Sequence, residues 1–457
     1  MIWFLMACIF VGDPQPNVVV LLADDLGWAD LGCYGSAFHE TPNLDLLASN
    51  GMRFSQAYSA ASLCSPTRAS IMTGKHPARV NITDWIPGAG HAGRLLKTPE
   101  DIHNLPLSEF TLGEAFADSG YSTFYVGKWH LGSPSHGPDK QGFETYVPTA
   151  TRTVSDAGKS KRTSIAIPDG DRWHLTRYIT EKSIEFIENQ TSAQPFFAFI
   201  AYHDVHTPVL PDNHFVQHFR TKLRPQSQPP IMEGVGKTRM SQDNPEYASM
   251  VAGLDASVGK ILRSLESAGL EKNTIVLFAS DNGGLSTLQK RLGPACNLPL
   301  RAGKGWLYEG GIRIPLIAKF PNRIQAGVTS DAVVTTTDFY PTLLSLAKLP
   351  NKPKQHIDAT DFSPVLLNNG GAELQRDLFW HFPHYHGSCW TPGSAMRSGN
   401  WKLVRFYETE ETQLFDLASD PSERQDVSEA EPTIVSKMSK KLTNWQDRIG
   451  AALPVKK

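Results

Sequence analysis

The sequence lacks several features that would assign it to a whole class of proteins. Its 457 residues contain 44 Lys and Arg against 46 Asp and Glu, so the formal net charge is −2. Without an excess of positive charge, nucleic acid is not an expected partner, and any anion must be recognised locally. We find no internal repeat and no low-complexity tract, and 40% hydrophobic residues are enough for a well-buried core.

Cysteine is also scarce, and none of the cysteines forms a C-x-x-C pair. The five are Cys8, Cys33, Cys64, Cys296 and Cys389. This spacing excludes a disulfide scaffold and the common zinc and redox motifs. One bridge among Cys33, Cys296 and Cys389 is possible in an oxidising compartment, but the spacing does not select a pair.

Long apolar runs are missing as well. The run over residues 1–11 is shorter than the roughly 20 residues that cross a bilayer. We interpret residues 1–12 as the remnant of a secretory signal without its basic start, the alternative being an irregular N-terminal strand. We therefore expect a secreted or periplasmic protein, with no stable membrane insertion and no lipoprotein anchor at Cys8.

The chain contains instead short apolar runs that end in polar residues. Those we interpret as strands cover residues 17–23, 121–126, 195–201 and 274–279. Helical periodicity lies between them, which predicts an α/β fold with a mostly parallel central sheet flanked by helices. Ligands bind beyond the carboxyl ends of such strands, so the four polar endings predict one site.

The pattern of apolar residues changes after residue 350, from continuous runs to short alternating segments. Short alternating segments over residues 401–407 and 413–417 predict a small antiparallel sheet, and residues 432–449 predict a terminal helix that packs on it. We therefore expect a large catalytic domain over residues 13–350 and a C-terminal subdomain over residues 372–457 that completes the substrate pocket.

Two pairs of oxygen-bearing side chains follow predicted strands. Asp24 and Asp25 follow the first strand, and Asp281 and Asn282 follow the strand over residues 274–279. Carboxylate and amide oxygens favour Ca²⁺ or Mg²⁺ over zinc. Either pair alone would be typical of a turn or a helix cap. Together, at two strand ends, they predict a metal site.

The stretch Cys64-Ser-Pro-Thr-Arg68 places a sulfur at the junction of a loop and a helix, with Arg68 about one turn beyond Cys64. Alone it would indicate a structural cysteine. With Thr73-Gly74 it resembles the signature of the formylglycine-dependent, arylsulfatase-like sulfatases of the alkaline phosphatase superfamily. In that family a maturation enzyme oxidises the cysteine to an aldehyde, and the aldehyde hydrate attacks the sulfur of a sulfate ester.

Three further motifs resemble the same family in the expected order. They are Gly-Lys128-Trp-His130, His206 in His-Thr-Pro, and Gly-Lys304-Gly. The resemblance implies that Lys128 neutralises charge, that His130 exchanges a proton with the hydrate, that His206 contacts the substrate and protonates the leaving oxygen, and that Lys304 binds the sulfate.

The resemblance also implies the metal and the order of events. One Ca²⁺, with Mg²⁺ less expected, would be held by Asp24, Asp25, Asp281 and Asn282 and would contact residue 64. The metal and Arg68 would polarise the hydrate, one hydroxyl would attack sulfur, and a second hydroxyl, deprotonated by His130, would expel sulfate. The likeness extends from residue 17 to about residue 315 and continues weakly into residues 398–403.

Other functions remain open at this stage. A phosphodiesterase or phosphonate monoester hydrolase of the same superfamily would share the sheet and the metal carboxylates. A non-catalytic calcium-dependent glycan-binding protein belongs to another class. An alkaline-phosphatase-like enzyme would need a serine or threonine nucleophile and further zinc ligands, which we cannot assemble from the motifs.

The preferred substrates are sulfated glycans, together with aryl sulfates, because secreted sulfatases that resemble this chain commonly act on glycans. His384, His386 and Trp390 lie in an aromatic segment of the C-terminal subdomain. Ring stacking and hydrogen bonding to a sugar would suit these residues. Packing between the two domains is an equally good interpretation of the same segment.

Overall fold

The computed structural model describes residues 14–88, 93–149, 151–154, 160–163, 172–224, 228–371 and 374–457. The segment interpreted as a signal remnant, residues 1–12, lies outside the described residues, as does Cys8. No helix in the described ranges combines the length and the apolar character needed to cross a membrane. The four cysteines that are described, Cys33, Cys64, Cys296 and Cys389, are free thiols.

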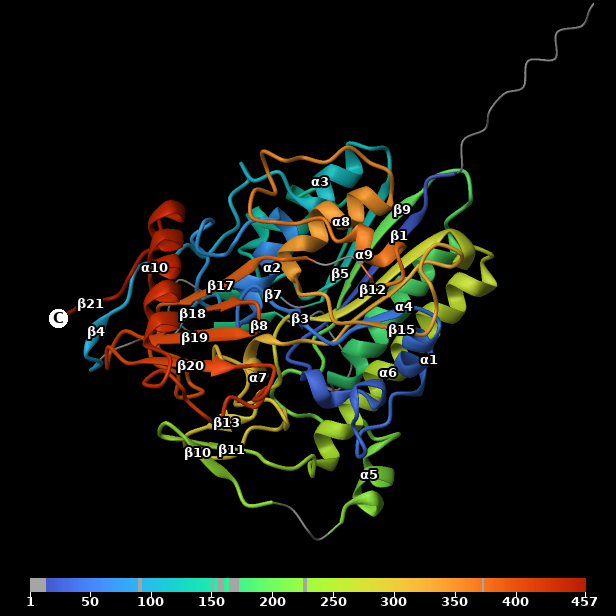
Figure 1. Cartoon of the computed structure of the whole chain (residues 1–457). Helices are drawn as coiled ribbons and strands as arrows, with labels where there is room; N and C mark the ends of the chain where they lie inside the picture. Colours follow the sequence, from blue (N-terminus) through green and yellow to red (C-terminus); the bar gives the residue numbers. More distant parts are fainter. Residues whose placement is uncertain are drawn as a thin grey trace, which may run out of the picture.

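An eight-stranded sheet forms the centre of the large domain (Figure 1). Its strand order is β15-β2-β14-β12-β1-β9-β5-β6. The four predicted strands are its central ones and run parallel: β12 (Thr274–Ser280), β1 (Asn17–Ala23), β9 (Phe196–Ala201) and β5 (Ser122–Gly127). The outer strands are β6 (Thr145–Pro148), β14 (Leu316–Lys319), β2 (Met52–Phe54) and β15 (Val328–Ser330), of which β14 is antiparallel to both neighbours.

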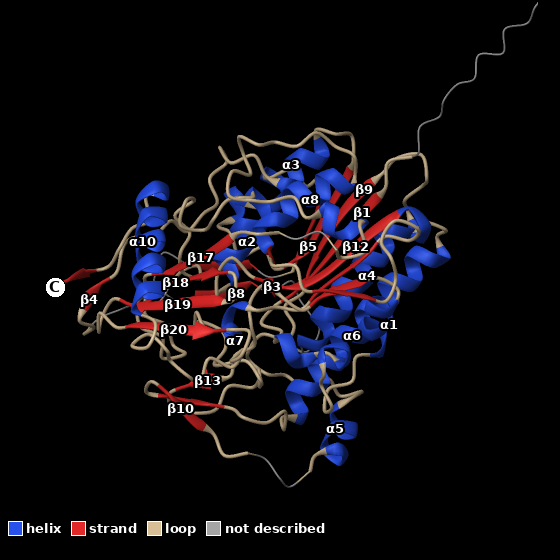
Figure 2. Cartoon of the chain, in the orientation of Figure 1, coloured by secondary structure: helices blue, strands red, loops and turns tan. Residues whose placement is uncertain are grey.

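Helices cover both faces of this sheet (Figure 2). Alternate residues of β1 enter two separate apolar clusters, because successive side chains of a strand point to opposite faces. One cluster contains side chains of α2 (Cys64–Thr73), α3 (Leu112–Ala117) and α8 (Phe339–Leu346). The other contains side chains of α1 (Pro42–Ser49), α4 (Arg172–Glu188) and α6 (Pro245–Ser267). The predicted α/β class is confirmed.

The smaller C-terminal part is an antiparallel sheet with a helix on one face. Its strands are β17 (Asp377–Phe382), β18 (Gly393–Ser398), β19 (Trp401–Phe406) and β20 (Thr412–Asp416), and the helix is α10 (Pro432–Ile449). Met438, Leu442 and Trp445 of the helix pack on apolar side chains of the sheet. This arrangement confirms the predicted small sheet and terminal helix.

The remaining strands and α-helices of the described chain are short. They are β3 (Ala57–Tyr58), β4 (Leu96–Lys97), β7 (Thr151–Val154), β8 (Ser160–Thr163), α5 (Val216–Lys222), β10 (Ile231–Glu233), β11 (Gly236–Thr238), β13 (Thr287–Leu288), α7 (Glu309–Ile312), β16 (Val334–Thr335), α9 (Ser363–Leu367) and β21 (Val455–Lys456). Strands β10, β11 and β13 form a separate three-stranded sheet.

A buried ionic cluster joins the small sheet to the large domain. Lys402 Nζ of β19 lies 2.9 Å from Glu309 Oε1 of α7 and 2.7 Å from Glu423 Oε1, and all three side chains are fully buried. Glu309 also accepts from Arg313 Nε at 2.7 Å. Burial alone would raise the pKa of Glu309, but Lys402 and Arg313 hold it below its ordinary value. Burial raises the pKa of Glu423.

We predict that Lys402→Met lowers the free energy of unfolding by roughly 3–5 kcal/mol, because it removes the ammonium that faces two buried carboxylates. Lys441→Met is the matched control. Lys441 forms a half-exposed ion pair with Asp377, with Nζ 2.8 Å from Oδ2, so its loss should cost less than about 1 kcal/mol. Urea denaturation at pH 7 measures both variants. Equal losses in the two variants would contradict the assignment.

Candidate active site

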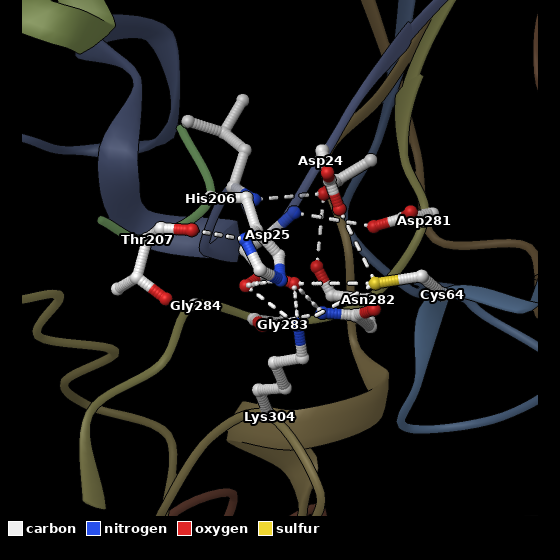
Figure 3. A network of polar contacts seen from close by, with 12 residues as sticks. Asp24, Asp25, Cys64, His206, Thr207, Asp281, Asn282, Gly283, Gly284 and Lys304 are labelled. Atoms are coloured by element: carbon white, nitrogen blue, oxygen red, sulfur yellow. Dashed lines mark hydrogen bonds and ion pairs between the residues drawn. The ribbon is translucent and has the colours of Figure 1, made fainter. Parts of the chain in front are cut away.

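Two strand ends bring the predicted oxygen ligands together. Ala23 of β1 is in register with Ser280 of β12, so the pairs Asp24-Asp25 and Asp281-Asn282 leave the sheet side by side. The backbone N–H of Asp281 donates to Ala23 O at 3.1 Å, and that of Asp25 donates to Asp281 Oδ1 at 3.1 Å. All four side chains are buried. The two sequence motifs therefore form one cluster (Figure 3).

Cys64 begins α2 and points into this cluster (Figure 3). Its Sγ donates to Asp24 Oδ1 at 3.2 Å and lies 3.7 Å from Asp25 Oδ1, and Lys304 Nζ donates to it at 3.4 Å. Burial, reinforced by the charges of Asp24 and Asp281, raises the pKa of the thiol well above its ordinary value. The thiolate is the nucleophilic form of cysteine. An unmodified Cys64 is therefore a poor nucleophile at neutral pH.

Three cations neutralise the three carboxylates of the cluster. Arg68 donates through Nε and Nη2 to Asp281 Oδ2 at 2.9 and 2.8 Å. Lys128 Nζ donates to Asp24 Oδ2 at 2.7 Å, and Lys304 Nζ donates to Asp25 Oδ2 at 2.8 Å. Burial would raise the pKa of Asp24, but the positive charges around it, Lys128 first, hold it well below its ordinary value.

His206 is partly exposed, with 30% of its side-chain surface accessible. Its Nε2 lies 3.6 Å from Asp25 Oδ2, and its Nδ1 lies 2.6 Å from the carbonyl oxygen of Thr207. Burial of the ring and then the charge of Lys304 lower its pKa to about 4. The ring is therefore neutral at pH 7, with a face open to a ligand.

His130 is partly exposed as well. Its Nε2 lies 2.6 Å from Ile86 O, and its Nδ1 is buried without a hydrogen-bond partner in the described part of the chain. Burial, followed by the charge of Lys128, lowers its pKa well below the ordinary value. His130 is close enough to Lys128 and Arg68 for their positive charges to lower its pKa, but it forms no hydrogen bond with Cys64.

The three residues proposed to contact a sugar occupy different environments. Trp390 is 1% exposed and packs on Trp306 at 5.5 Å between ring centroids, which fits the interpretation as packing between the domains. His384 is buried, with Nε2 2.8 Å from Thr83 Oγ1. His386 is half-buried and lies against Gly305, where an added Cβ would come within 2.2 Å of its Nδ1. Of the three, His386 alone combines partial exposure with a place beside the Lys304 loop.

The chemistry of the cluster fits a hard metal ion. Among the described residues, Asp24, Asp25, Cys64 and His206 each offer a ligand atom within 4.8 Å of the others. Asn282 Oδ1 adds a buried oxygen that has no hydrogen-bond partner in the described chain, as expected for an atom that awaits a cation. Sequence reasoning assigned His206 to the substrate alone, because no spacing signal links it to the two Asp motifs.

Comparison with known proteins decides the family. The model of the family described as Sulfatase matches residues 16–349. This chain belongs to the sulfatase family. A second model, described as N-sulphoglucosamine sulphohydrolase, C-terminal, matches residues 302–448.

Named relatives are about one third identical to this sulfatase over the aligned residues. N-acetylgalactosamine-6-sulfatase of Mus musculus is 32% identical over 458 residues, which cover 90% of this chain and 82% of the relative. Arylsulfatase A of Homo sapiens is 32% identical over 437 residues, which cover 89% of this chain and 78% of the relative. The protein is accordingly an enzyme of the sulfuric ester hydrolases, and its reaction is the hydrolysis of sulfate esters. The phosphodiesterase and glycan-binding alternatives receive no support.

Solved structures share this architecture over nearly the whole chain. The crystal structure of Ps i-CgsB in complex with k-i-k-neocarrahexaose is 27% identical, with a TM-score of 0.75, and the match covers 94% of this chain and 92% of that chain. A structure determined in complex with D-glucosamine-2-N,6-O-disulfate is 21% identical, with a TM-score of 0.73, and the match covers 95% and 98%. The second likeness concerns the fold alone.

The position of Asn282 depends on a close approach of two backbones, which can be tested. A Cβ on Gly283 would lie 1.9 Å from Gly310 O, so Gly283→Ala must displace the end of β12 or the start of α7. We expect at least about a 10²-fold loss of sulfatase kcat/KM, because misplacement of a site by about 1 Å has that effect.

The matched control is Gly371→Ala, whose nearest neighbour, Asn368 O, is at an ordinary 3.5 Å. Turnover of an aryl sulfate, recorded together with the melting temperature, checks both variants. Activity of Gly283→Ala at the level of this control would contradict the structure.

Proposed function

We propose that this sulfatase hydrolyses sulfate monoesters of glycans, and aryl sulfates in addition, with a formylglycine made from Cys64 as nucleophile and one Ca²⁺ as cofactor. The observation that carries the proposal is the environment of Cys64. Its sulfur lies among Asp24, Asp25 and Lys304, yet its thiol is kept protonated. A site built around an unreactive thiol favours chemical conversion of that residue.

The formylglycine and the Ca²⁺ ion would supply what the side chains lack, which is a nucleophilic oxygen and a divalent positive charge. A hydrated aldehyde at residue 64 would provide a hydroxyl for attack on sulfur, and Ca²⁺ would balance the carboxylates and draw charge from the sulfuryl oxygens. Asp24, Asp25, Asp281 and Asn282 would hold the ion, since their donors are oxygens and Asn282 Oδ1 is an orphaned buried acceptor.

The cations of the cluster bind and orient the substrate in this proposal. Arg68 is fixed by Asp281 and by the carbonyl oxygen of Lys128, so it presents a rigid positive charge beside residue 64. Lys128, which follows β5, and Lys304, which lies in the loop before α7, reach the same cluster from separate parts of the chain. With the carboxylates balanced by a divalent ion, both ammonium groups become available to a sulfate group, and electrostatic stabilisation of this kind is a large catalytic contribution.

The two histidines divide the proton transfers. His206 has 30% of its surface accessible and is the proposed proton donor to the leaving alcohol; because its ring is neutral at pH 7, it must first take up a proton, which the negative charge of a bound sulfate group favours. His130 is neutral, with Nδ1 buried and unpaired among the described residues, so it can accept a proton from a group at residue 64. Both roles stay proposals that rest on position and protonation state.

Glycans are the proposed substrates because several similar proteins carry the name of a sugar sulfatase or were solved with a sulfated sugar. His386, beside the Lys304 loop, is the proposed contact to the sugar from the C-terminal sheet. The proposal also includes a maturation enzyme that oxidises Cys64, and secretion or a periplasmic location.

The first test concerns residue 64. We expect peptide mass spectrometry of active protein to find the aldehyde in place of the thiol, and we expect Cys64→Ala to reduce turnover by at least about 10⁴-fold, as the loss of a nucleophile does. Cys389→Ala, a free and half-buried cysteine outside the cluster, should keep its activity. Fully active protein with only a thiol at position 64 would rule out the proposed nucleophile.

The second test concerns the metal. Removal of calcium by a chelator should lower both turnover and melting temperature, and restoring calcium to 100 times its Kd should return about 2.7 kcal/mol of stability. Asn282→Leu, which removes an oxygen donor and keeps the size of the side chain, should weaken both effects. Full activity with an unchanged melting temperature in rigorously metal-free protein would defeat the assignment.

A further inference from the structure

A cavity of about 280 Å³ opens next to His206. Thr207 and Pro208, the two residues that follow His206, form one wall, and Arg239, Asn244 and Arg291 form another part of the lining. In Figure 3, Thr207 and Gly284 are drawn on the opposite side of Asp25 from Cys64. The cavity therefore adjoins the side of the cluster on which Thr207 lies, away from Cys64.

Arg291 reaches this cavity from a loop whose base belongs to the catalytic site. The chain leaves β12 through Asp281 and Asn282 and continues to Gly284, whose carbonyl accepts from Lys304 N at 3.1 Å. From there it forms a loop whose two ends are joined by hydrogen bonds: Gly293 N donates to Ser286 O at 3.2 Å, and Ala295 N donates to Leu285 O at 3.1 Å. Arg291 lies within this loop, two residues before Gly293.

The two arginines of the cavity differ in what they can offer a ligand. Arg239 is committed to the protein, since it pairs with Asp243 and its Nε donates to Gly293 O at 2.8 Å. Arg291 is exposed and forms no hydrogen bond or ion pair with any described residue. No acidic side chain is among the described residues that line the cavity. The cavity thus presents one positive charge that nothing described in the protein neutralises.

We propose that this cavity is a second anion-binding subsite, in which Arg291 binds a sulfate or carboxylate group on the sugar unit next to the one that carries the cleaved sulfate. The fork of a guanidinium matches the oxygens of both groups. Pro208 and Leu292 add apolar surface for the C–H face of a sugar ring. The proposal rests on the proposed function and refines it: the substrate is an oligosaccharide with a second negative charge.

Competitive inhibition of 4-nitrophenyl sulfate turnover tests the subsite, because this aryl sulfate has only one anionic group and no neighbouring sugar unit. The inhibitors are three disaccharides that share one sulfate ester and carry on the neighbouring unit a second sulfate, a carboxylate or no charge. We expect wild-type protein to bind the doubly charged disaccharides about tenfold more tightly than the singly charged one, the scale of a hydrogen-bonded charge. This advantage should shrink at high salt.

Arg291→Gln should abolish the advantage and leave kcat/KM for the aryl sulfate unchanged. Lys290→Gln is the matched control, since it removes an adjacent exposed charge that does not line the cavity, and it should keep the advantage. An advantage that survives in Arg291→Gln, or that is absent in the wild type, overturns the subsite. Failure of the wild type to turn over the aryl sulfate would overturn the proposed function instead, so the two failures are distinguishable.

Discussion

The structure depends on a balance of charge among buried side chains. Asp24, Asp25 and Asp281 are buried at the ends of two strands, and burial of an unpaired carboxylate costs several kcal/mol. Arg68, Lys128 and Lys304 come from three separate segments of the chain and offset this cost by pairing with the carboxylates. The sheet, helix α2 and the loop before α7 are therefore held together by the same contacts that prepare the site for chemistry.

Much of this arrangement can be predicted from the sequence, because its signals are local. The run Asn17–Ala23 is apolar after its first residue, a pattern typical of a parallel strand covered on both faces, so it predicts the parallel sheet. Once two such strands are neighbours, the residues after their ends must meet. The pairs Asp24-Asp25 and Asp281-Asn282 could thus be placed together before the register of Ala23 and Ser280 was known.

What could not be predicted depends on long-range packing. An aromatic residue with a polar tip suits a sugar site and an apolar core equally well, so nothing local shows that Trp390 is covered by Trp306. Lys402 lies in an ordinary alternating strand, and its burial against Glu309 and Glu423 exists only when the two domains meet. In the same way, Arg291 becomes part of a cavity only after its loop closes beside Thr207.

The charge balance also constrains how metal and substrate act on each other. While Lys128 pairs with Asp24 and Lys304 with Asp25, the cluster has little net positive charge to offer an anion. A divalent cation held by the same carboxylates would add two charges and release both ammonium groups from their partners. Metal and sulfate should then strengthen each other's binding, and by linkage the two effects must be equal in size. If the proposed Ca²⁺ binds here, an anionic ligand would bind more tightly to the metal-loaded enzyme without any change of fold.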